Sequence, residues 1–491
     1  MLDFGIKMAR LVTFFSLLCW FIVSSTPSPN PFGNFQFPNV AGVDEFDKAK
    51  LGLFIHWGPV SQWGTEISFP LQCKSFPCTV MGANRVSIII NNTDQLAAHR
   101  QSYRDLANTF NPTDFNATAL ADLAFDAGFR YVTPTAIHCD GFSLYQSEVN
   151  KAYSMSATPF NRDVTGELLD AFRARGMRGG VYVCPSLWNN DDYIFPDALT
   201  GFTSPDSCCY PNYSPYDNPE SWGKFVSYLH DIVNEITKKY KPEHYWFDTG
   251  NMPSLGIDTH LELLTPNMRA ANNESIMQTR EGSGLQDYVE SEDHSEAAVS
   301  SVIGLTYASV GGAKFEVPGT LGDQWAFDPN AVYKTAAEVI EDLVLIVSKG
   351  GNYLLNIGLD ASGKWADGAV ETLSGMAAWM KYGGEAIHGS TTTWPFELEG
   401  VFFTASRDLK YTYAFFAEST IDDARKTLTI TSYKPSLLKS GVADVSLLSE
   451  NGDVKLPFVL DEIGLAIDFS EVEGSEVVNP NFLNIVRITW G

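Results

Sequence analysis

The stretch WGKFVSYLHDIVNEITKKYKPEHYWFDTG, Trp222–Gly250, contains one complete helix-then-strand unit. Apolar residues recur with the helical period as far as Tyr240, and the aromatic run His244–Phe247 that follows is typical of a buried strand. The run ends on a carboxylate, Asp248, and a glycine soon after it. Because an aspartate inside an apolar strand is costly unless it is paired or stands at the open end, Asp248 is either a loop cap or a functional group.

The same unit recurs on both sides of this stretch. The expected strands are Leu51–Gly58, Arg130–Phe142, Gly179–Ser186, Glu274–Arg280 and Asn352–Gly358, and the expected helices are Leu120–Phe129, Val164–Gly176 with Asp163 as its cap, Tyr333–Gly351 and Gly368–Gly384. This alternation predicts parallel βα units, arranged as a closed barrel or as an open doubly wound sheet. No GxGxxG follows the first strand, and polar residues recur at many strand ends. We therefore expect an α/β fold built on a (β/α)8 TIM-like barrel.

The pattern changes at about residue 390. From there, β-branched and aromatic residues alternate without a helical period, as in GVFFTASRDLKYTYAFFAE and NFLNIVRITW. Such short alternating runs predict a C-terminal antiparallel β-sandwich over residues 390–491, packed on a catalytic barrel over residues 26–389.

The first residues have the order of a secretory signal peptide. Lys7 and Arg10 precede the apolar run LVTFFSLLCWFIV, and small residues follow it. This order predicts a signal peptide over residues 1–25, cut after Ser25, and a secreted, extracellular protein with no membrane segment after signal removal. A retained anchor helix is the alternative. Four Asn-x-Ser/Thr sequons fit a secreted glycoprotein: Asn91, Asn116, Asn212 and Asn273.

Charge and cysteines exclude several classes of function. With 33 Lys+Arg against 59 Asp+Glu, the formal net charge of −26 repels nucleic acid. Cys73 and Cys78 can close a small loop, and Cys208 and Cys209 can each staple a loop, but the pairing cannot be deduced from sequence. No spacing forms a zinc set, and we expect neither a metal nor an organic cofactor.

Polar residues that follow the strands form the candidate site, because the carboxyl ends of barrel strands meet at one face. They are His56, His138, Asp140, Asp248, Arg280, Glu292 and Glu316, with Trp57, Phe142, Trp188, Trp246 and Trp325 beside them. Carboxylates among tryptophans favour a sugar ligand. A glycosidase needs two facing carboxyl groups, one ionised and one able to hold a proton. Asp248 suits the ionised role if Arg280 or a histidine balances its charge.

Each candidate has an ordinary structural alternative. Asp248 can be a loop cap, His56 and His138 can be satisfied structural histidines, and Arg280 can belong to a surface ion pair. The glutamates carry the weakest signal, because VESEDHSE has the composition of a solvated loop.

Five ordered motifs resemble glycoside hydrolase family 29, the retaining α-L-fucosidases, between Asp47 and His388. They are KLGLFIHWGPVSQWG, YVTPTAIHCDGFSLYQS, TPFNRDVTGELLDAFRARGM, HYWFDTG and YKTAAEVIEDLVLIVSKGGNYLLNIG. The resemblance implies a catalytic barrel followed by a β-sandwich, as divided above. It also implies an exo-acting enzyme that removes terminal α-L-fucose from fucosylated oligosaccharides or glycoconjugates with retention.

The resemblance implies roles for particular residues. Asp248 would be the nucleophile that forms a covalent fucosyl-enzyme. The substrate-binding residues would be His56, Glu66, His138, Arg280 and Trp325. Glu292, in DYVESE, is favoured as the acid/base because Arg280 and Asp287 keep the expected spacing, and Glu316, in FEV, is the alternative. Whichever glutamate acts should have a raised pKa beside an ionised aspartate.

Three positions depart from the family pattern. Cys139 replaces the second histidine of an HHDGF motif, Ile137 stands where lysine is common, and Ile67 replaces a tryptophan after Glu66. These changes bear on affinity and substrate range more than on the reaction. Two other functions stay open, namely another retaining exo-glycosidase such as a galactosidase, and a catalytically inactive fucose-binding protein.

Overall fold

The computed structural model describes residues 39–73, 76–188, 190, 219–248, 258–280, 285–290, 314–422, 424–438, 440–472, 479 and 481–491. The expected signal peptide, Cys208, Cys209 and Asn212 lie outside these ranges. Among the described helices, none combines the length and the apolar character that a bilayer crossing requires.

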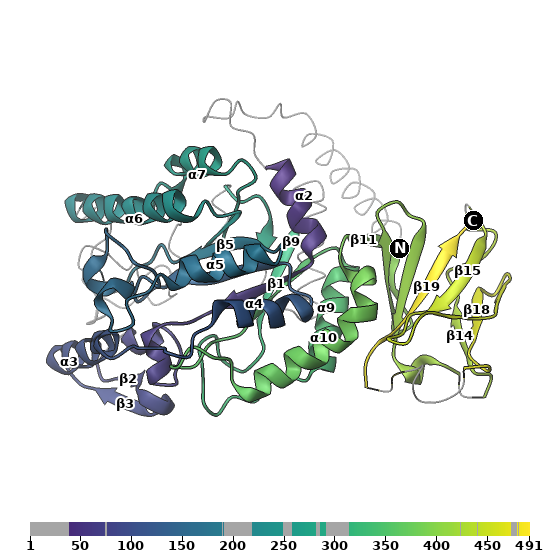
Figure 1. Ribbon diagram of the computed structural model, residues 1–491, viewed down its shortest axis with the longest axis horizontal. Helices are drawn as coiled ribbons and strands as arrows, with labels where there is room; N and C mark the ends of the chain where they lie inside the picture. The colour runs from purple at the N-terminus through teal and green to yellow at the C-terminus, as the bar shows by residue number, and fades with distance from the viewer. Residues whose placement is uncertain are drawn as a thin grey trace, which may run out of the picture. The chain divides into compact units, whose positions relative to one another are not determined.

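Eight parallel strands form one sheet that curls into a near-closed barrel (Figure 1). Its order is β7-β6-β5-β4-β1-β10-β9-β8. The strands are β1 (Leu51–Ile55), β4 (Tyr131–Ile137), β5 (Arg178–Val183), β6 (His244–Phe247), β7 (Ile276–Thr279), β8 (Val289–Glu290), β9 (Phe315–Thr320) and β10 (Asn352–Asn356). Because β1 pairs with β10 on one side and with β4 on the other, the first and last strands of the barrel are neighbours. The predicted (β/α)8 fold class is confirmed.

The seam between β7 and β8 is bridged by one buried aspartate. The Asp287 carboxylate accepts the Met277 backbone N–H at 2.7 Å, and the Asp287 N–H donates to the Met277 carbonyl at 2.8 Å. Arg269 donates to the same carboxylate at 2.7 Å. These bonds satisfy backbone groups that a ladder would otherwise pair.

Helices accompany the strands of the barrel. They are α2 (Val40–Ala49), α4 (Ala117–Asp126), α5 (Val164–Ala174), α6 (Pro219–Tyr240), α7 (Thr265–Ala271), α9 (Ala336–Ser348) and α10 (Asp367–Ile387). Of these, α4, α5 and α9 begin at polar side-chain caps. Asp163 caps α5 by accepting the Gly166 N–H at 3.0 Å, as the sequence predicts. A reciprocal capping box of Thr335 and Glu338 begins α9. An insertion between β1 and β4 adds the hairpin β2 (Cys78–Met81) and β3 (Ser87–Ile90) and the helix α3 (Thr93–Arg104).

Aromatic side chains fill the inside of the barrel. Tyr182 stacks on Trp246 with ring centroids 5.6 Å apart, and Phe54 meets Trp246 edge-on at 5.2 Å. Tyr131 and Leu354 belong to the same buried cluster. The inside of the barrel is therefore a packed core. A ligand has room only beyond these aromatic side chains, at the carboxyl ends of the strands.

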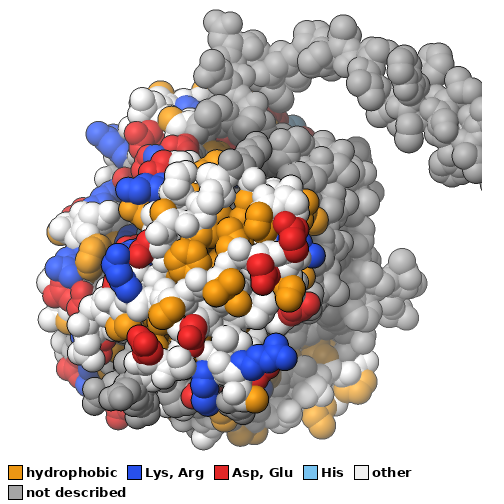
Figure 2. Space-filling view, turned by 90° about the vertical axis from the view of Figure 1, so that its right-hand side faces the viewer, with side chains coloured by type: hydrophobic (Ala, Val, Ile, Leu, Met, Phe, Trp, Pro, Cys, Tyr) orange, Lys and Arg blue, Asp and Glu red, His pale blue; other side chains and the backbone are white. Residues whose placement is uncertain are grey.

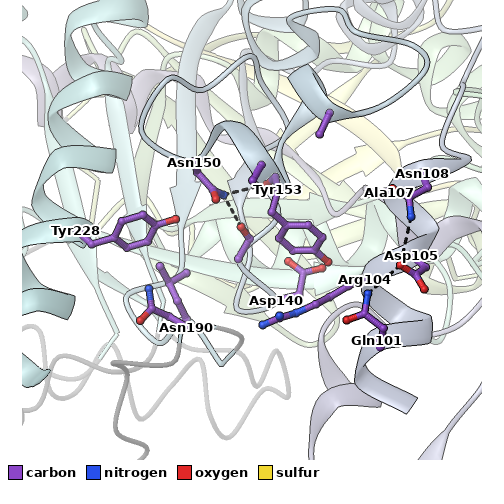
Figure 3. Close-up of a pocket in the computed structure, with 14 residues that line it drawn as sticks. Gln101, Arg104, Asp105, Ala107, Asn108, Asp140, Asn150, Tyr153, Asn190 and Tyr228 are labelled. Atoms are coloured by element: carbon purple, nitrogen blue, oxygen red, sulfur yellow. Dashed lines mark hydrogen bonds between the residues drawn. The ribbon is translucent and has the colours of Figure 1, made fainter. Parts of the chain in front are cut away.

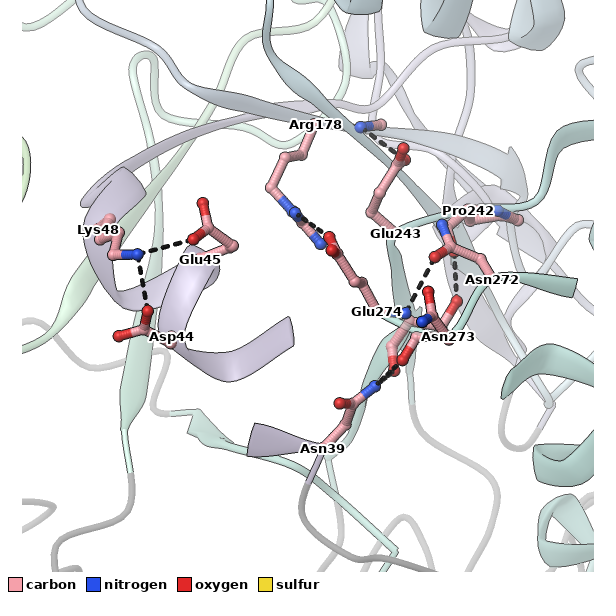
Figure 4. Close-up of polar contacts among 12 residues, drawn as sticks. Asn39, Asp44, Glu45, Lys48, Arg178, Pro242, Glu243, Asn272, Asn273 and Glu274 are labelled. Carbon is pink, nitrogen blue, oxygen red and sulfur yellow. Dashed lines mark hydrogen bonds and ion pairs between the residues drawn. The ribbon is translucent and has the colours of Figure 1, made fainter. Parts of the chain in front are cut away.

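Polar contacts tie together the segments at the amino ends of the strands (Figure 4). Asn39 donates to the Asn273 carbonyl at 2.7 Å, and Arg178 pairs with Glu274 at 3.0 Å. Residues at this face of a barrel stabilise the fold, since the chemistry takes place at the opposite face.

Antiparallel strands follow α10. One sheet has the order β11-β12-β13-β19-β15-β16 and another β14-β18-β17. The strands are β11 (Ser390–Leu398), β12 (Val401–Ser406), β13 (Tyr411–Phe416), β14 (Thr427–Ile430), β15 (Val442–Leu447), β16 (Val454–Lys455), β17 (Phe458–Leu460), β18 (Leu465–Asp468) and β19 (Asn484–Trp490). Phe403, Phe416, Ile430, Ile467 and Val486 share one core, which confirms the predicted sandwich. Its visible face mixes apolar and charged side chains (Figure 2).

Candidate active site

Asp248 follows the last residue of β6 and is held from two sides. Its backbone N–H donates to the Val183 carbonyl at 3.1 Å, which places it at the carboxyl end of the sheet. Arg280, just past β7, brings its Nη1 to 3.0 Å from Oδ1 of Asp248. The Tyr182 hydroxyl donates to Oδ2 at 2.5 Å. Both carboxylate oxygens are thus paired with groups that stabilise the anion.

This pairing sets the protonation state of Asp248. Burial opposes ionisation, but the charge of Arg280 and the hydrogen bond from Tyr182 outweigh it, so the pKa of Asp248 lies below its usual range. The carboxylate is therefore ionised at neutral pH, as a nucleophile must be. Because Arg280 pairs with this strand-end carboxylate, it is not the surface ion pair considered as an alternative.

Replacing Arg280 with glutamine should lower kcat/KM and move the acidic limb of its pH profile to higher pH. Activity exists above the pKa of Asp248 and is lost below it, so removing the charge that depresses this pKa narrows the active range from the acid side. We expect a loss of about a hundredfold or more at the wild-type optimum. Arg178→Gln, which breaks an ion pair of the same 3.0 Å length at the opposite face, is the matched control. An unmoved acidic limb in the Arg280 variant would refute this role.

His56 lies beside Asp248 as a neutral acceptor. Its Nδ1 is 2.7 Å from Oδ1 of Asn356, whose amide nitrogen donates to the Trp325 carbonyl at 2.6 Å. Since the amide oxygen of Asn356 faces the ring, Nδ1 carries the proton and Nε2 can accept a hydrogen bond from a hydroxyl group. Burial lowers the pKa of His56 to about 4, so the ring stays neutral.

His138 is fixed by a buried polar network. Its Nδ1 lies 2.6 Å from Ser68 Oγ, which accepts the Asp140 N–H at 2.7 Å. The Tyr103 hydroxyl donates to the Asp140 carboxylate at 2.8 Å. The His138 ring stacks on Tyr182 with centroids 5.0 Å apart, and burial lowers its pKa to about 3. Burial also raises the pKa of Asp140 to about 6. The Asp140 backbone N–H, acting through Ser68, thus helps to fix the His138 ring.

Glu66 holds the segment that carries Trp325. Its Oε2 accepts the Trp325 N–H at 2.8 Å, and its Oε1 accepts the N–H groups of Ala326 at 3.1 Å and of Ile67 at 2.9 Å. The Trp325 ring lies 5.1 Å from the His56 ring. Glu66 therefore brings the tryptophan to the site through the backbone.

Glu66→Gln should raise KM for a sugar substrate about tenfold with a smaller change in kcat. The amide group of glutamine would face backbone N–H donors, and hydrogen bonds from those donors to a charged group are worth about 1.5–3 kcal/mol each. The Trp325 segment would lose its anchor. Steady-state kinetics check this, with Glu338→Gln, a capping glutamate on α9, as the control. A change in kcat alone would contradict a role in binding.

The two candidate acid/base glutamates are placed very differently. Glu316 is the second residue of β9, is 0% exposed, and accepts hydrogen bonds from Tyr131 at 2.6 Å and from Trp246 at 3.0 Å. Burial raises its pKa to about 8, as a general acid requires. However, Glu316 lies within the aromatic core instead of at the strand end, so it is not brought to Asp248. Glu292 lies outside the described residues.

Sequence reasoning missed Tyr182 and Asn356, which position Asp248 and His56. Both are polar residues on strands whose side chains point into the barrel, and alternation along Gly179–Ser186 was the signal available for Tyr182. Arg280 also contacts a second carboxylate that was not singled out, Glu290, at 3.3 Å.

Two disulfides occur in the described part of the chain. Cys73 pairs with Cys78, so the small loop that the sequence allows does close. Cys139 pairs with Cys184 and joins the ends of β4 and β5. Cys139, the departure from the family histidine, is therefore part of a covalent bridge beside His138.

Two described groups bring three metal-ligand atoms within 4.8 Å of one another. They are His138, Cys139 and Asp248, and, separately, Asp258, His260 and Glu262. In the first, the sulfur is already bound in the disulfide, which removes the thiolate a metal would need. In the second, His260 is exposed, and its Nδ1 lies 3.3 Å from Asp258 and 3.1 Å from Glu262.

A cavity of about 540 Å³ has Asp140 among the residues that line it (Figure 3). Asn150 and Tyr153 line it, and the Asn150 amide donates to the Tyr153 carbonyl at 2.9 Å. Of the residues that surround the Asp248 carboxylate, none lines this cavity.

Comparison with known proteins gives concordant results. The family model described as Alpha-L-fucosidase matches residues 39–385. The chain is 24% identical to the alpha-L-fucosidase of Dictyostelium discoideum over 98% of this chain and 99% of the relative, and 26% identical to the human tissue alpha-L-fucosidase over 88% and 86%. An alpha-L-fucosidase of Bacteroides thetaiotaomicron, solved as a trapped covalent intermediate, shares the fold with a TM-score of 0.70 at 19% identity, covering 94% and 100% of the two chains.

Proposed function

The chain belongs to the alpha-L-fucosidase family and is a glycoside hydrolase of that type, and from this premise we propose that it is a secreted, exo-acting enzyme for terminal α-L-fucose. It removes fucose from oligosaccharides or glycoconjugates with retention. The observation that carries the proposal is the Asp248 carboxylate, which is ionised and paired with Arg280 and Tyr182 at the barrel's carboxyl face.

In the proposed mechanism, Asp248 attacks the anomeric carbon while an acid protonates the leaving oxygen. The bond to the leaving group breaks and a fucosyl-aspartate forms. The same group, now a base, then takes a proton from water, whose oxygen attacks the anomeric carbon. The bond to Asp248 breaks, and fucose leaves with retained configuration. We assign the acid/base role to Glu292, because Glu316 is enclosed in the barrel core.

The neutral histidines and Trp325 form the sugar-binding part of the site. His56 Nε2 accepts a hydrogen bond from a sugar hydroxyl, and His138 supplies a second ring nitrogen. The Trp325 ring provides an apolar face for C–H groups. An apolar wall that fits the 6-methyl group would discriminate fucose from galactose by about 1–3 kcal/mol.

Release of 4-nitrophenol from the aryl α-L-fucoside, measured beside the matching β-D-galactoside, tests the proposal. We expect turnover of the fucoside alone. Faster turnover of the galactoside would identify another retaining exo-glycosidase. If neither glycoside is hydrolysed and fucose still raises the melting temperature, the protein is a fucose-binding protein.

Secretion is part of the proposal. The basic, apolar and small residues of the first 25 positions support it. So do the sequons at Asn91, Asn116 and Asn273, whose side chains are exposed. N-terminal sequencing of the protein from culture medium should begin after Ser25, and an intact N-terminus would contradict processing.

A further inference from the structure

We propose that the Cys139–Cys184 disulfide is a positioning element of the reaction. It holds the ends of β4 and β5 together, and these ends carry His138 and Tyr182, which lie beside Asp248. The inference rests on the proposed function, because it takes Asp248 as the nucleophile.

The bridge lies where the backbone ladder between β4 and β5 is irregular. Thr135 pairs with Tyr182 in the regular register. The next pair is Ile137 with Val183, so β4 contains one extra residue at this point. A bulge of this kind disrupts the ladder and redirects the side chains that follow it. The disulfide joins the two strands just beyond the bulge, where backbone pairing alone specifies their alignment least.

The Cys139 sulfur lies close to the groups that the bridge would position. It lies 4.0 Å from the Tyr182 hydroxyl oxygen, and within 4.8 Å of a carboxylate oxygen of Asp248 and a ring nitrogen of His138. The His138 and Tyr182 rings stack with an interplanar angle of 5°. This ring pair spans the same two strands as the bridge, so a relative shift of the strands would separate the rings and displace the Tyr182 hydroxyl.

The Cys139–Cys184 bridge is buried, unlike a disulfide that joins exposed loops. Cys139 is 2% exposed and Cys184 is 0% exposed. The Trp188 N–H donates to the Cys139 carbonyl at 2.7 Å, which adds a second link between the two strand ends. The other described disulfide, Cys73–Cys78, spans five residues and packs in a separate cluster with Val80 and Ile90. It provides a matched control.

Breaking the bridge should therefore weaken the hydrogen bond from Tyr182 to Asp248. Loss of that bond raises the pKa of Asp248, so the acidic limb of kcat/KM moves to higher pH. We expect a shift of about one pH unit and a fall in kcat/KM of about tenfold or more, the scale of a hydrogen bond to a charged group. If the bridge served only folding, breaking it would lower the melting temperature without moving the acidic limb of the pH profile.

The experiment compares wild type, Cys139→Ala/Cys184→Ala, Cys73→Ala/Cys78→Ala and Tyr182→Phe in pH profiles on the aryl fucoside, well below each melting temperature. Non-reducing peptide mapping of the wild type should first show the Cys139–Cys184 link. The expected result is the same limb shift in the Cys139/Cys184 and Tyr182 variants and none in the control. Free thiols at Cys139 and Cys184 in the wild type would overturn the proposal. So would an acidic limb that does not move in the Cys139/Cys184 variant, or one that moves equally in the Cys73/Cys78 control.

Two further outcomes are distinguishable. An inactive wild type would refute the proposed function itself, whatever the variants do. If the Cys139/Cys184 variant does not fold, the single Cys184→Ala variant is measured. Failure of both to fold, while the control folds, would assign the bridge to stability and overturn the positioning role.

Discussion

Asp248→Gly is expected to lower kcat/KM for an aryl α-L-fucoside by at least about a thousandfold, because it removes the group that forms the covalent intermediate. Arg280 and Tyr182 would remain, but they would face an empty space instead of an anion. The folded barrel should persist, since Asp248 lies after β6 and outside its buried strand. The measurement is the initial rate of 4-nitrophenol release across pH.

Two additions make this test specific. Azide enters the space left by the carboxylate and attacks the anomeric carbon from the same face, so it should restore part of the rate and yield an inverted fucosyl azide. Glu274→Gln is the control, because it removes a carboxylate that pairs with an arginine at the amino face of the same barrel. Near-normal hydrolysis by the glycine variant would show that Asp248 is not the nucleophile.

Glu292→Ala should cause the second largest loss, about a hundred- to ten-thousandfold on substrates whose leaving group needs protonation. The loss should be smaller on 4-nitrophenyl fucoside, whose leaving group departs without much assistance. Azide should accelerate turnover of the glycosyl-enzyme because it needs no general base. The basic limb of the pH profile, which reports the acid, should disappear.

Glu316→Gln is the comparison for that prediction. Burial raises the pKa of Glu316 to about 8, so the side chain is protonated at neutral pH and glutamine is a close mimic. Tyr131 and Trp246 donate to different oxygens of Glu316, so glutamine keeps an acceptor for only one of these two donors. We expect a lower melting temperature and little change in rate. The reverse pattern, with azide rescue at Glu316 and none at Glu292, would exchange the two assignments.

Much of the fold could be predicted because its units are local. The α6–β6 unit shows its helical period and its apolar strand within one stretch, and the Asp163 cap depends only on residues three positions apart. Asp248 and Arg280 were identified for the same reason, since each directly follows a strand and barrel topology brings strand ends together.

The residues that were missed depend on contacts between distant strands. Tyr182 reaches Asp248 only because β5 and β6 are in the register that sets Tyr182 beside Trp246. The Cys139–Cys184 bridge spans 45 residues and requires β4 and β5 to be neighbours. Glu316 shows the converse, because its place in FEV does not reveal that its side chain points into the aromatic core.

Trapping the intermediate tests the central claim most directly. The enzyme is incubated with 2-fluoro-fucosyl fluoride, digested, and its peptides are analysed by mass spectrometry. The account predicts one fluorofucosyl group on the carboxylate of Asp248, with activity lost in proportion to labelling. A label on any other residue, or full turnover of fucosides with no label on the protein, would contradict it.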